Sequence, residues 1–207
     1  MAIKSNRDYI EALEKTGDIV KIKDEVDWDL EAGAITRRVC ERKGPAVLLE
    51  KIKDYPGHRM LGSPLATYRR LATAMGLDVA TPPGKLHEEF ETRFENRIKP
   101  IEVKSGPCKE NIITGDKVNL FDFPVPMVHE GDGGRYIGTW HAVISKEPDT
   151  GWHNWGMYRV AVHNKRHVGC QMVVTSDMGR IFHQKFVPQG KPMPVAVAVG
   201  MDPLSSL

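Results

Sequence analysis

Residues 136–151 are Tyr-Ile-Gly-Thr-Trp-His-Ala-Val-Ile-Ser-Lys-Glu-Pro-Asp-Thr-Gly, an apolar and β-branched run followed by a strong turn signal. The run predicts a strand over residues 136–145, and the Pro, Asp and Gly after it predict a turn. Three more strands are predicted downstream, over residues 158–163, 168–175 and 195–199, the last of them fully buried. A helix is predicted over residues 178–185. Successive hairpins of this kind are typical of a meandering antiparallel barrel or sandwich.

The first hundred residues have a different pattern, in which apolar residues at helical spacing alternate with short apolar strands. Ser5 and Asp8 form a weak version of the capping box for a first helix, which Gly17 ends. Asp29 is expected to cap a second helix. Strands are expected at residues 19–22 and 46–49, and further helices at residues 66–75 and 85–96. This order of elements predicts an α/β layer structure.

The pattern changes at Pro100, after which short strands replace the helices. We therefore place a domain boundary near residues 100–110. The chain ends a few residues after its most hydrophobic strand, and an unpaired strand leaves a sheet edge unprotected. We expect either a partner chain or a lost C-terminal portion to complete the fold.

Composition argues against several classes of function. The net charge is +2, from 29 basic and 27 acidic residues spread along the chain, so nothing marks a surface for nucleic acid or an anionic membrane. The three cysteines lack CxxC spacing, which argues against a disulfide framework or a cysteine zinc site. There is no apolar run of membrane-spanning length, and the N-terminus is too polar for a secretory signal. We expect a cytoplasmic protein whose partner is a small molecule or another protein.

The most unusual segment is Gly-Trp-His-Asn-Trp-Gly-Met-Tyr-Arg, residues 151–159. On a straight strand Asn154 and Arg159 would point to opposite faces, but a bulge or kink at Gly156 would let both converge on one site. An Asn oxygen can bind a divalent cation, and a guanidinium can grip a carboxylate or a phosphate. The nearby tryptophans and Tyr158 could wall a ring system. The alternative is a strand with interfacial aromatic residues and a surface arginine.

A second candidate lies between a predicted strand and a predicted helix. Asp177 could help to hold a metal ion there, or Ser176 or Asp177 could cap the helix. Among the histidines, His163 and His167 have HxxxH spacing, but the spacing spans a predicted turn, which favours solvent-facing side chains. His141 and His153 lie next to or within the unusual segment.

Several stretches resemble one known family, the UbiD-like decarboxylases. The stretch Asn154-Trp-Gly-Met-Tyr-Arg159, followed by Val-Ala-Val-His-Asn-Lys-Arg, is similar to the family signature. Four other stretches also match the family, at residues 24–31, 62–70, 133–139 and 194–203. The resemblance implies an α+β fold, with an N-terminal α/β domain over residues 1–105. It implies part of an antiparallel, flavin-reductase-like split β-barrel that binds flavin over residues 106–207.

The resemblance also implies a chemistry and a set of cofactors. The family performs reversible, non-oxidative decarboxylation of aromatic or α,β-unsaturated acids with prenylated FMN, a divalent metal, usually Mn²⁺, and a nearby K⁺. By this resemblance Asn154 binds the metal, Arg159 belongs to a Glu-Arg-Glu network beside the flavin, and Thr139 contacts the cofactor or potassium. The stretch Trp155, Gly156, Met157 and Tyr158 lies along the flavin, and Ser176 contacts it. The implied partners are an aromatic acid, CO₂, a flavin prenyltransferase that supplies the cofactor, and further subunits in an oligomer.

Two departures from the family stand out. The family has a histidine metal ligand where this chain has Asp177, and aspartate can replace histidine for a hard ion. The family's third metal ligand, a Glu, and both acids of its Glu-Arg-Glu network are expected beyond the last residue of this chain. The leading hypothesis is therefore a truncated or partial decarboxylase. A non-catalytic subunit of a multi-subunit carboxylase, completed by its partner, and a flavin-binding redox barrel are the alternatives.

Overall fold

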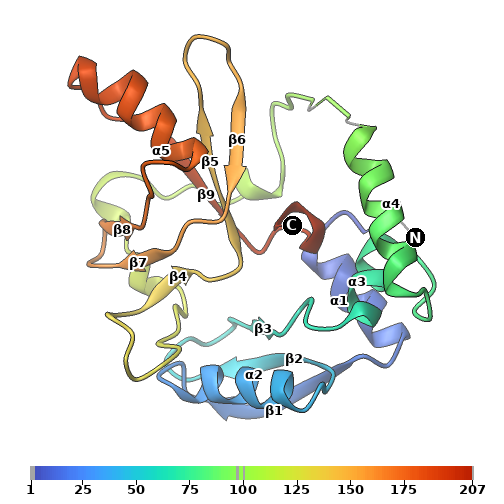
Figure 1. Cartoon of the computed structure of the whole chain (residues 1–207). Helices are drawn as coiled ribbons and strands as arrows, with labels where there is room; N and C mark the ends of the chain where they lie inside the picture. The colour runs from blue at the N-terminus through green and yellow to red at the C-terminus, as the bar shows by residue number, and fades with distance from the viewer. Residues whose placement is uncertain (1–2, 97, 100, 207) are drawn as a thin grey trace.

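The computed structural model describes residues 3–96, 98–99 and 101–206, so the predicted change of pattern at Pro100 falls outside the described residues. The described residues have a mixed α+β fold with three small sheets of three strands each (Figure 1). None of these three sheets closes into a barrel within the described ranges. No helix in the same ranges is long and apolar enough to cross a membrane.

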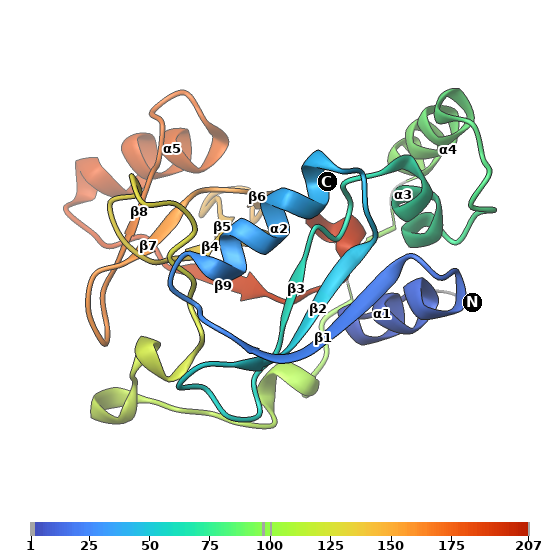
Figure 2. The same cartoon turned by 90° about the horizontal axis from the view of Figure 1, so that it is seen from below.

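The first sheet has the order β1-β2-β3 and belongs to residues 3–96, which we call the first part of the chain (Figure 2). Its strands are β1 (Ile19–Val26), β2 (Ala46–Ile52) and β3 (Met60–Gly62). β1 and β2 are parallel and are joined by helix α2 (Glu31–Glu41), whereas β3 is antiparallel to β2. The other helices of this part are α1 (Asn6–Lys15), α3 (Tyr68–Met75) and α4 (Pro83–Glu95). The helices and strands expected from the sequence are thus present.

Local capping was predicted correctly for one helix and wrongly for another. The Ser5 Oγ accepts a hydrogen bond from the Asp8 N–H at 3.1 Å, which is one half of a capping box, while the Asp8 carboxylate accepts from the Lys4 N–H at 3.0 Å. The prediction for Asp29 is wrong, because α2 starts after Leu30, which has φ 66° and provides no side-chain cap. The cause is tertiary: the Leu30 N–H donates to the Met127 carbonyl at 2.9 Å, so a distant segment holds this helix start.

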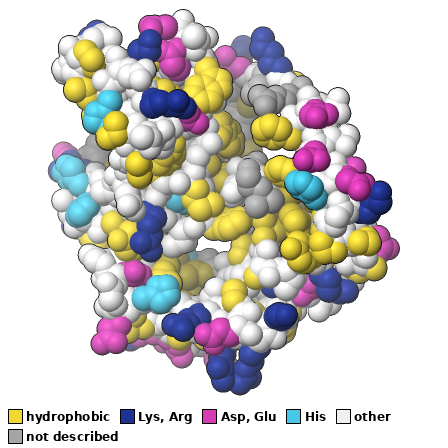
Figure 3. All heavy atoms as spheres, viewed as in Figure 1, with side chains coloured by type: hydrophobic (Ala, Val, Ile, Leu, Met, Phe, Trp, Pro, Cys, Tyr) yellow, Lys and Arg dark blue, Asp and Glu magenta, His cyan; other side chains and the backbone are white. Residues whose placement is uncertain are grey.

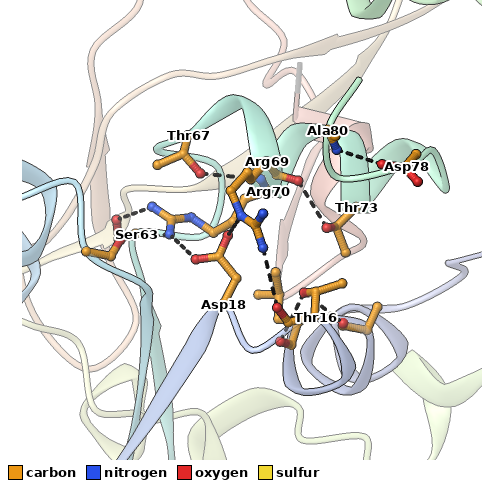
Figure 4. A network of polar contacts seen from close by, with 12 residues as sticks. Thr16, Asp18, Ser63, Thr67, Arg69, Arg70, Thr73, Asp78 and Ala80 are labelled. Atoms are coloured by element: carbon orange, nitrogen blue, oxygen red, sulfur yellow. Dashed lines mark hydrogen bonds and ion pairs between the residues drawn. The ribbon is translucent and has the colours of Figure 1, made fainter. Parts of the chain in front are cut away.

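A buried arginine organises the interior of the first part (Figure 4). The Arg70 side chain is 0% exposed and pairs with Asp18 at 3.0 Å. Its Nη1 also donates to the Gly44 carbonyl at 2.9 Å, and Nη2 lies 3.5 Å from the Ser63 Oγ. Asp18 precedes β1, Ser63 follows β3 and Arg70 lies in α3. One guanidinium in α3 therefore holds the start of β1 and the Gly44 carbonyl, both distant in the sequence, as well as the end of the neighbouring strand β3.

Residues 101–206, which we call the second part of the chain, hold two sheets. One has the order β4-β7-β8 and the other β6-β5-β9. The strands of the first are β4 (Tyr136–Gly138), β7 (Val160–Val162) and β8 (Val168–Cys170), and those of the second are β6 (His153–Gly156), β5 (His141–Lys146) and β9 (Val195–Val199). The strand predicted over residues 136–145 is therefore two strands in different sheets. The strands predicted at 158–163 and 168–175 are real but shorter.

The remaining turn and helix largely follow the sequence. The Glu147 carboxylate accepts hydrogen bonds from the Thr150 Oγ1 and N–H, both at 2.6 Å, which lower its pKa to about 2 and fix the predicted turn. Helix α5 (Asp177–Ile181) continues into a π-helical turn, Phe182–Phe186.

The prediction that residues 195–199 are fully buried is wrong. Val195 is 50% exposed and Val199 is 57% exposed, because β9 is an edge strand that pairs only with β5 among the described strands. Apolar side chains also gather along the middle of the face in Figure 3. A cavity of about 180 Å³ lies under β9, between the two sheets and α5, lined mainly by Val143, Val160, Met172, Met178, Phe182 and Met193.

Candidate functional site

The segment Asn154–Arg159 carries the chain from one sheet to the other. β6 ends at Gly156 and β7 begins at Val160 (Figure 1). The pairing of β6 with β5 runs without a register shift, so of the two expected distortions at Gly156, a bulge or a kink, the bulge is absent. The distortion is instead a complete change of sheet after Gly156. A Cβ at this position would lie 2.5 Å from Cε2 of Tyr158, which explains why a glycine stands there.

Asn154 and the start of α5 meet at one hydroxyl group. Asn154 is 5% exposed, and its Nδ2 donates to the Tyr158 Oη at 3.3 Å. The same oxygen accepts the Met178 N–H at 3.2 Å. The Asn154 Oδ1 accepts no hydrogen bond from any described residue, so an oxygen acceptor remains available beside α5. The structure therefore brings Asn154 close to the Ser176–Asp177 turn.

Ser176, and not Asp177, is the helix cap. The Ser176 Oγ accepts from the Gly179 N–H at 3.2 Å and donates to the Val173 carbonyl at 2.6 Å. The Asp177 carboxylate forms an ion pair with Arg180. Because Asp177 is exposed in part and is not needed as the cap, its carboxylate can exchange partners without unwinding the helix.

Arg159 and Thr139 form a second group on the neighbouring sheet. The Arg159 guanidinium lies over the ring of Tyr136, 4.9 Å from its centroid, and the residue is exposed. Gly138 pairs with Val160 in the antiparallel ladder, and Thr139, which follows Gly138, and Arg159, which precedes Val160, flank this pair at one end of the ladder. No hydrogen bond or ion pair among the described residues joins Arg159 to Asn154. Between the two groups Trp155 is 55% and Met157 is 47% exposed.

His141 supports this crossing, a role that the sequence did not assign to it. It is fully buried, and its Nε2 lies 2.7 Å from the Tyr158 carbonyl oxygen, to which it donates. Burial lowers the pKa of His141, which keeps the imidazole neutral. Its only sequence signal is its place beside the unusual segment. His163 and His167 are exposed in the turn between β7 and β8, as predicted.

The Tyr158 hydroxyl group gives a direct test of this geometry. Tyr158→Phe leaves the Met178 N–H and the Asn154 amide without their shared acceptor, so we expect the free energy of unfolding to fall by about 1–3 kcal/mol. Urea denaturation measures the change. The matched control is Tyr136→Phe, whose hydroxyl makes no hydrogen bond within the described ranges and whose loss should cost less than about 0.5 kcal/mol. Equal stability of the two variants would contradict the shared-acceptor geometry.

Comparison with known families matches both parts of the chain. Residues 10–90 match the 3-octaprenyl-4-hydroxybenzoate carboxy-lyase N-terminal domain, and residues 99–207 match the Rift-related domain of the same carboxy-lyase. Among curated proteins, the chain is 36% identical to a pyrrole-2-carboxylic acid decarboxylase of Pseudomonas aeruginosa, over 95% of this chain and 41% of that protein. It is 30% identical to ferulic acid decarboxylase 1 of Saccharomyces cerevisiae, over 97% of this chain and 42% of the relative.

Solved structures show the same relationship. A vanillic acid decarboxylase of Sedimentibacter hydroxybenzoicus in its closed form superposes with a TM-score of 0.90 at 29% identity, covering 98% of this chain and 44% of the other. An evolved dimeric UbiD-class enzyme of Pelotomaculum thermopropionicum, in complex with prFMN, superposes with a TM-score of 0.85 at 25% identity, over 96% of this chain and 45% of the other. The chain spans about two fifths of the length of the curated relatives named above.

Proposed function

The chain belongs to the UbiD family of carboxy-lyases, and on that basis we propose that it is the flavin-binding part of a reversible, non-oxidative decarboxylase for aromatic or α,β-unsaturated acids. The observation that carries this proposal is the crossing of Asn154–Arg159 between two sheets. It holds Asn154 inside while leaving Trp155, Met157 and Arg159 on the surface. The two curated relatives described above are both decarboxylases by name, which favours catalysis over a scaffold role.

We propose that the two sheets of the second part are the halves of a flavin-reductase-like split β-barrel, in a domain of residues 106–207 that follows an α/β domain of residues 1–105. The exposed face of β9 and the cavity beneath it support this proposal, because an incomplete barrel leaves apolar interior positions uncovered.

The exposed side chains fit a flat cofactor. Trp155 and Met157 offer exposed apolar surface that an isoalloxazine ring would cover. When bound, prenylated FMN supplies the electron sink for decarboxylation. Neutral His141 fixes the Tyr158 carbonyl and so holds the backbone along which the ring would lie. FMN and prFMN in solved UbiD-class relatives support this assignment.

The described residues supply some, but not all, of the ligands that a divalent metal ion needs. No group of three His, Cys, Asp or Glu side chains that could hold a metal occurs among the described residues. The chain offers the Asn154 Oδ1 and the Asp177 carboxylate, which are hard oxygen donors suited to Mn²⁺, and a cofactor phosphate and water would supply others. We propose these two residues as metal ligands, Ser176 as a flavin contact, and Thr139 as a contact to the cofactor or to K⁺.

Asp177→Ala is expected to lower the manganese and flavin content of the purified protein several-fold, because it removes the only carboxylate proposed for the site. Elemental analysis and the visible flavin absorbance measure the two contents. The matched control is Asp116→Ala, since Asp116 is also an exposed aspartate paired with an arginine, Arg166. Unchanged metal content in Asp177→Ala would contradict the proposed role of Asp177 as a metal ligand. Its carboxylate would then serve only the ion pair with Arg180.

Arg159 is proposed to bind the substrate carboxylate. Its guanidinium has no carboxylate partner among the described residues and rests on an aromatic ring, so its donors remain available to an acid. A permanent positive charge there positions the scissile carboxylate and stabilises nearby ionised acids.

We further propose that the enzyme works as a homo-oligomer or with a partner subunit in the cytoplasm, and receives its cofactor from a flavin prenyltransferase.

The proposal is tested by purifying the full-length protein, together with any partner subunit, from cells that also produce a flavin prenyltransferase. We expect bound flavin, release of CO₂ from one or more aromatic or α,β-unsaturated acids, and exchange of labelled bicarbonate into the acid. A protein that carries flavin but neither releases CO₂ nor exchanges bicarbonate with any acid of a broad panel would contradict the proposal.

A further inference from the structure

Arg135 joins the two parts of the chain through aromatic rings. Its guanidinium carbon lies 3.8 Å from the ring centroid of Trp28, and the centroids of Tyr55 and Phe121 lie at 5.7 and 5.5 Å. Nη2 donates to the Tyr55 Oη at 2.7 Å, and Nε donates to the Val125 carbonyl at 2.6 Å. Trp28 and Tyr55 belong to the first part, so this cation spans the junction. None of the ion pairs of the described residues includes Arg135.

The backbone reinforces the same junction. The Met127 N–H donates to the Trp28 carbonyl at 3.1 Å, and the Leu30 N–H donates to the Met127 carbonyl at 2.9 Å. Gly33 has no room for a Cβ, which would collide with the carbonyl oxygen of Val128. The segment before β4 is therefore docked against the first part by both side-chain and main-chain contacts.

The residue after Arg135 faces the candidate site. Tyr136 begins β4, and its ring lies under the Arg159 guanidinium. Successive side chains on a strand point to opposite faces. Arg135 can thus engage the junction while Tyr136 engages Arg159. The Arg135 carbonyl also accepts the Val162 N–H at 2.8 Å, which ties Arg135 to the strand that follows Arg159.

We propose that Arg135 is a positioning residue for Arg159. By clamping the start of β4 to Trp28 and Tyr55, it fixes the Tyr136 ring on which the Arg159 guanidinium lies. The effect of Arg135 on catalysis rests on the proposed function. The coupling, by which Arg135 fixes the Tyr136 ring and so the Arg159 guanidinium, is a property of the protein without flavin and can be tested there. Lysine cannot replace Arg135, because an ammonium lacks the planar face and the two divergent donors that the clamp uses.

Nuclear magnetic resonance of the flavin-free protein tests the coupling. The Nε–Hε signal of Arg159 should show the ring-current shift of Tyr136, and Tyr136→Leu should abolish that shift. We expect Arg135→Lys to move the signal in the same direction as Tyr136→Leu. Hydrogen exchange at the Val162 amide should become about tenfold faster, which corresponds to about 1.4 kcal/mol.

Two controls separate positioning from a general loss of stability. Arg37→Lys changes an exposed arginine of α2, and Leu86→Ala destabilises the core between α3 and α4. Neither should move the Arg159 signal. If Arg135→Lys does not fold, Tyr55→Phe removes one acceptor of the clamp and should cause a smaller shift in the same direction. A folded Arg135→Lys or Tyr55→Phe with the wild-type Arg159 signal would overturn the proposal, whatever the outcome of the decarboxylation assay.

Discussion

Replacing Arg159 with alanine is expected to lower kcat/KM of the flavin-loaded enzyme by about 10²–10³-fold or more, while the protein stays folded. The expected loss is that of a positioned donor to developing charge. Arg159 is exposed, and among the described residues its side chain contacts the Tyr136 ring, so its removal should change the free energy of unfolding by less than about 0.5 kcal/mol. Steady-state kinetics and urea denaturation measure the two quantities.

Two further variants define the role of this arginine. Arg159→Lys keeps the charge but loses the bidentate geometry, so its activity should lie between those of the wild type and the alanine variant. Arg166→Ala removes an exposed arginine of the β7–β8 turn, paired with Asp116, and should leave turnover unchanged. Near-normal turnover in Arg159→Ala would refute its role in binding the acid.

Arg70→Ala is expected to have the largest effect on stability of the predicted substitutions. It removes a guanidinium with 0% side-chain exposure and leaves Asp18, whose side chain is 14% exposed, without this partner. It also removes donors to the Gly44 carbonyl and the Ser63 hydroxyl. Breaking a buried pair from one side costs about 3–5 kcal/mol. For a protein of this size that corresponds to a melting temperature lower by roughly 10 °C.

The neighbouring arginine provides the matched control (Figure 4). Arg69 also pairs with Asp18, at 3.7 Å, but its side chain is 53% exposed. We expect Arg69→Ala to cost at most about 1 kcal/mol, as is usual for a surface ion pair. Differential scanning calorimetry measures the melting temperatures of both variants. Similar melting temperatures for Arg69→Ala and Arg70→Ala would show that burial of the guanidinium is not the source of the stability.

The parts of the fold that depend on local chemistry could be predicted from the sequence. The Ser5 cap and the turn at Glu147 need only side chains within three residues of one another. The start of α2 could not be predicted, because the partner of Leu30 is Met127, nearly a hundred residues away. The break between β4 and β5 was missed for a similar reason: apolar content predicts a strand but does not indicate which sheet each half joins.

In the candidate site too, features of the local sequence could be predicted, whereas contacts between distant segments could not. The unusual segment and the Asp177 turn were recognised from residue types and from a family resemblance. Their approach to each other depends on the Tyr158 hydroxyl, which bonds to both Asn154 and the Met178 amide. His141 and Arg135 act through a backbone carbonyl and through rings contributed by distant segments. Such roles leave no pattern in a single sequence.

The central claim is that the surface around Asn154–Arg159 receives the flavin. Hydrogen exchange of the protein with and without prenylated FMN and Mn²⁺ tests it most directly. The account predicts slower exchange in peptides that cover residues 152–160 and 175–179, with little change in the first sheet. Tight flavin binding that protects a different surface and leaves these two peptides unchanged would contradict it.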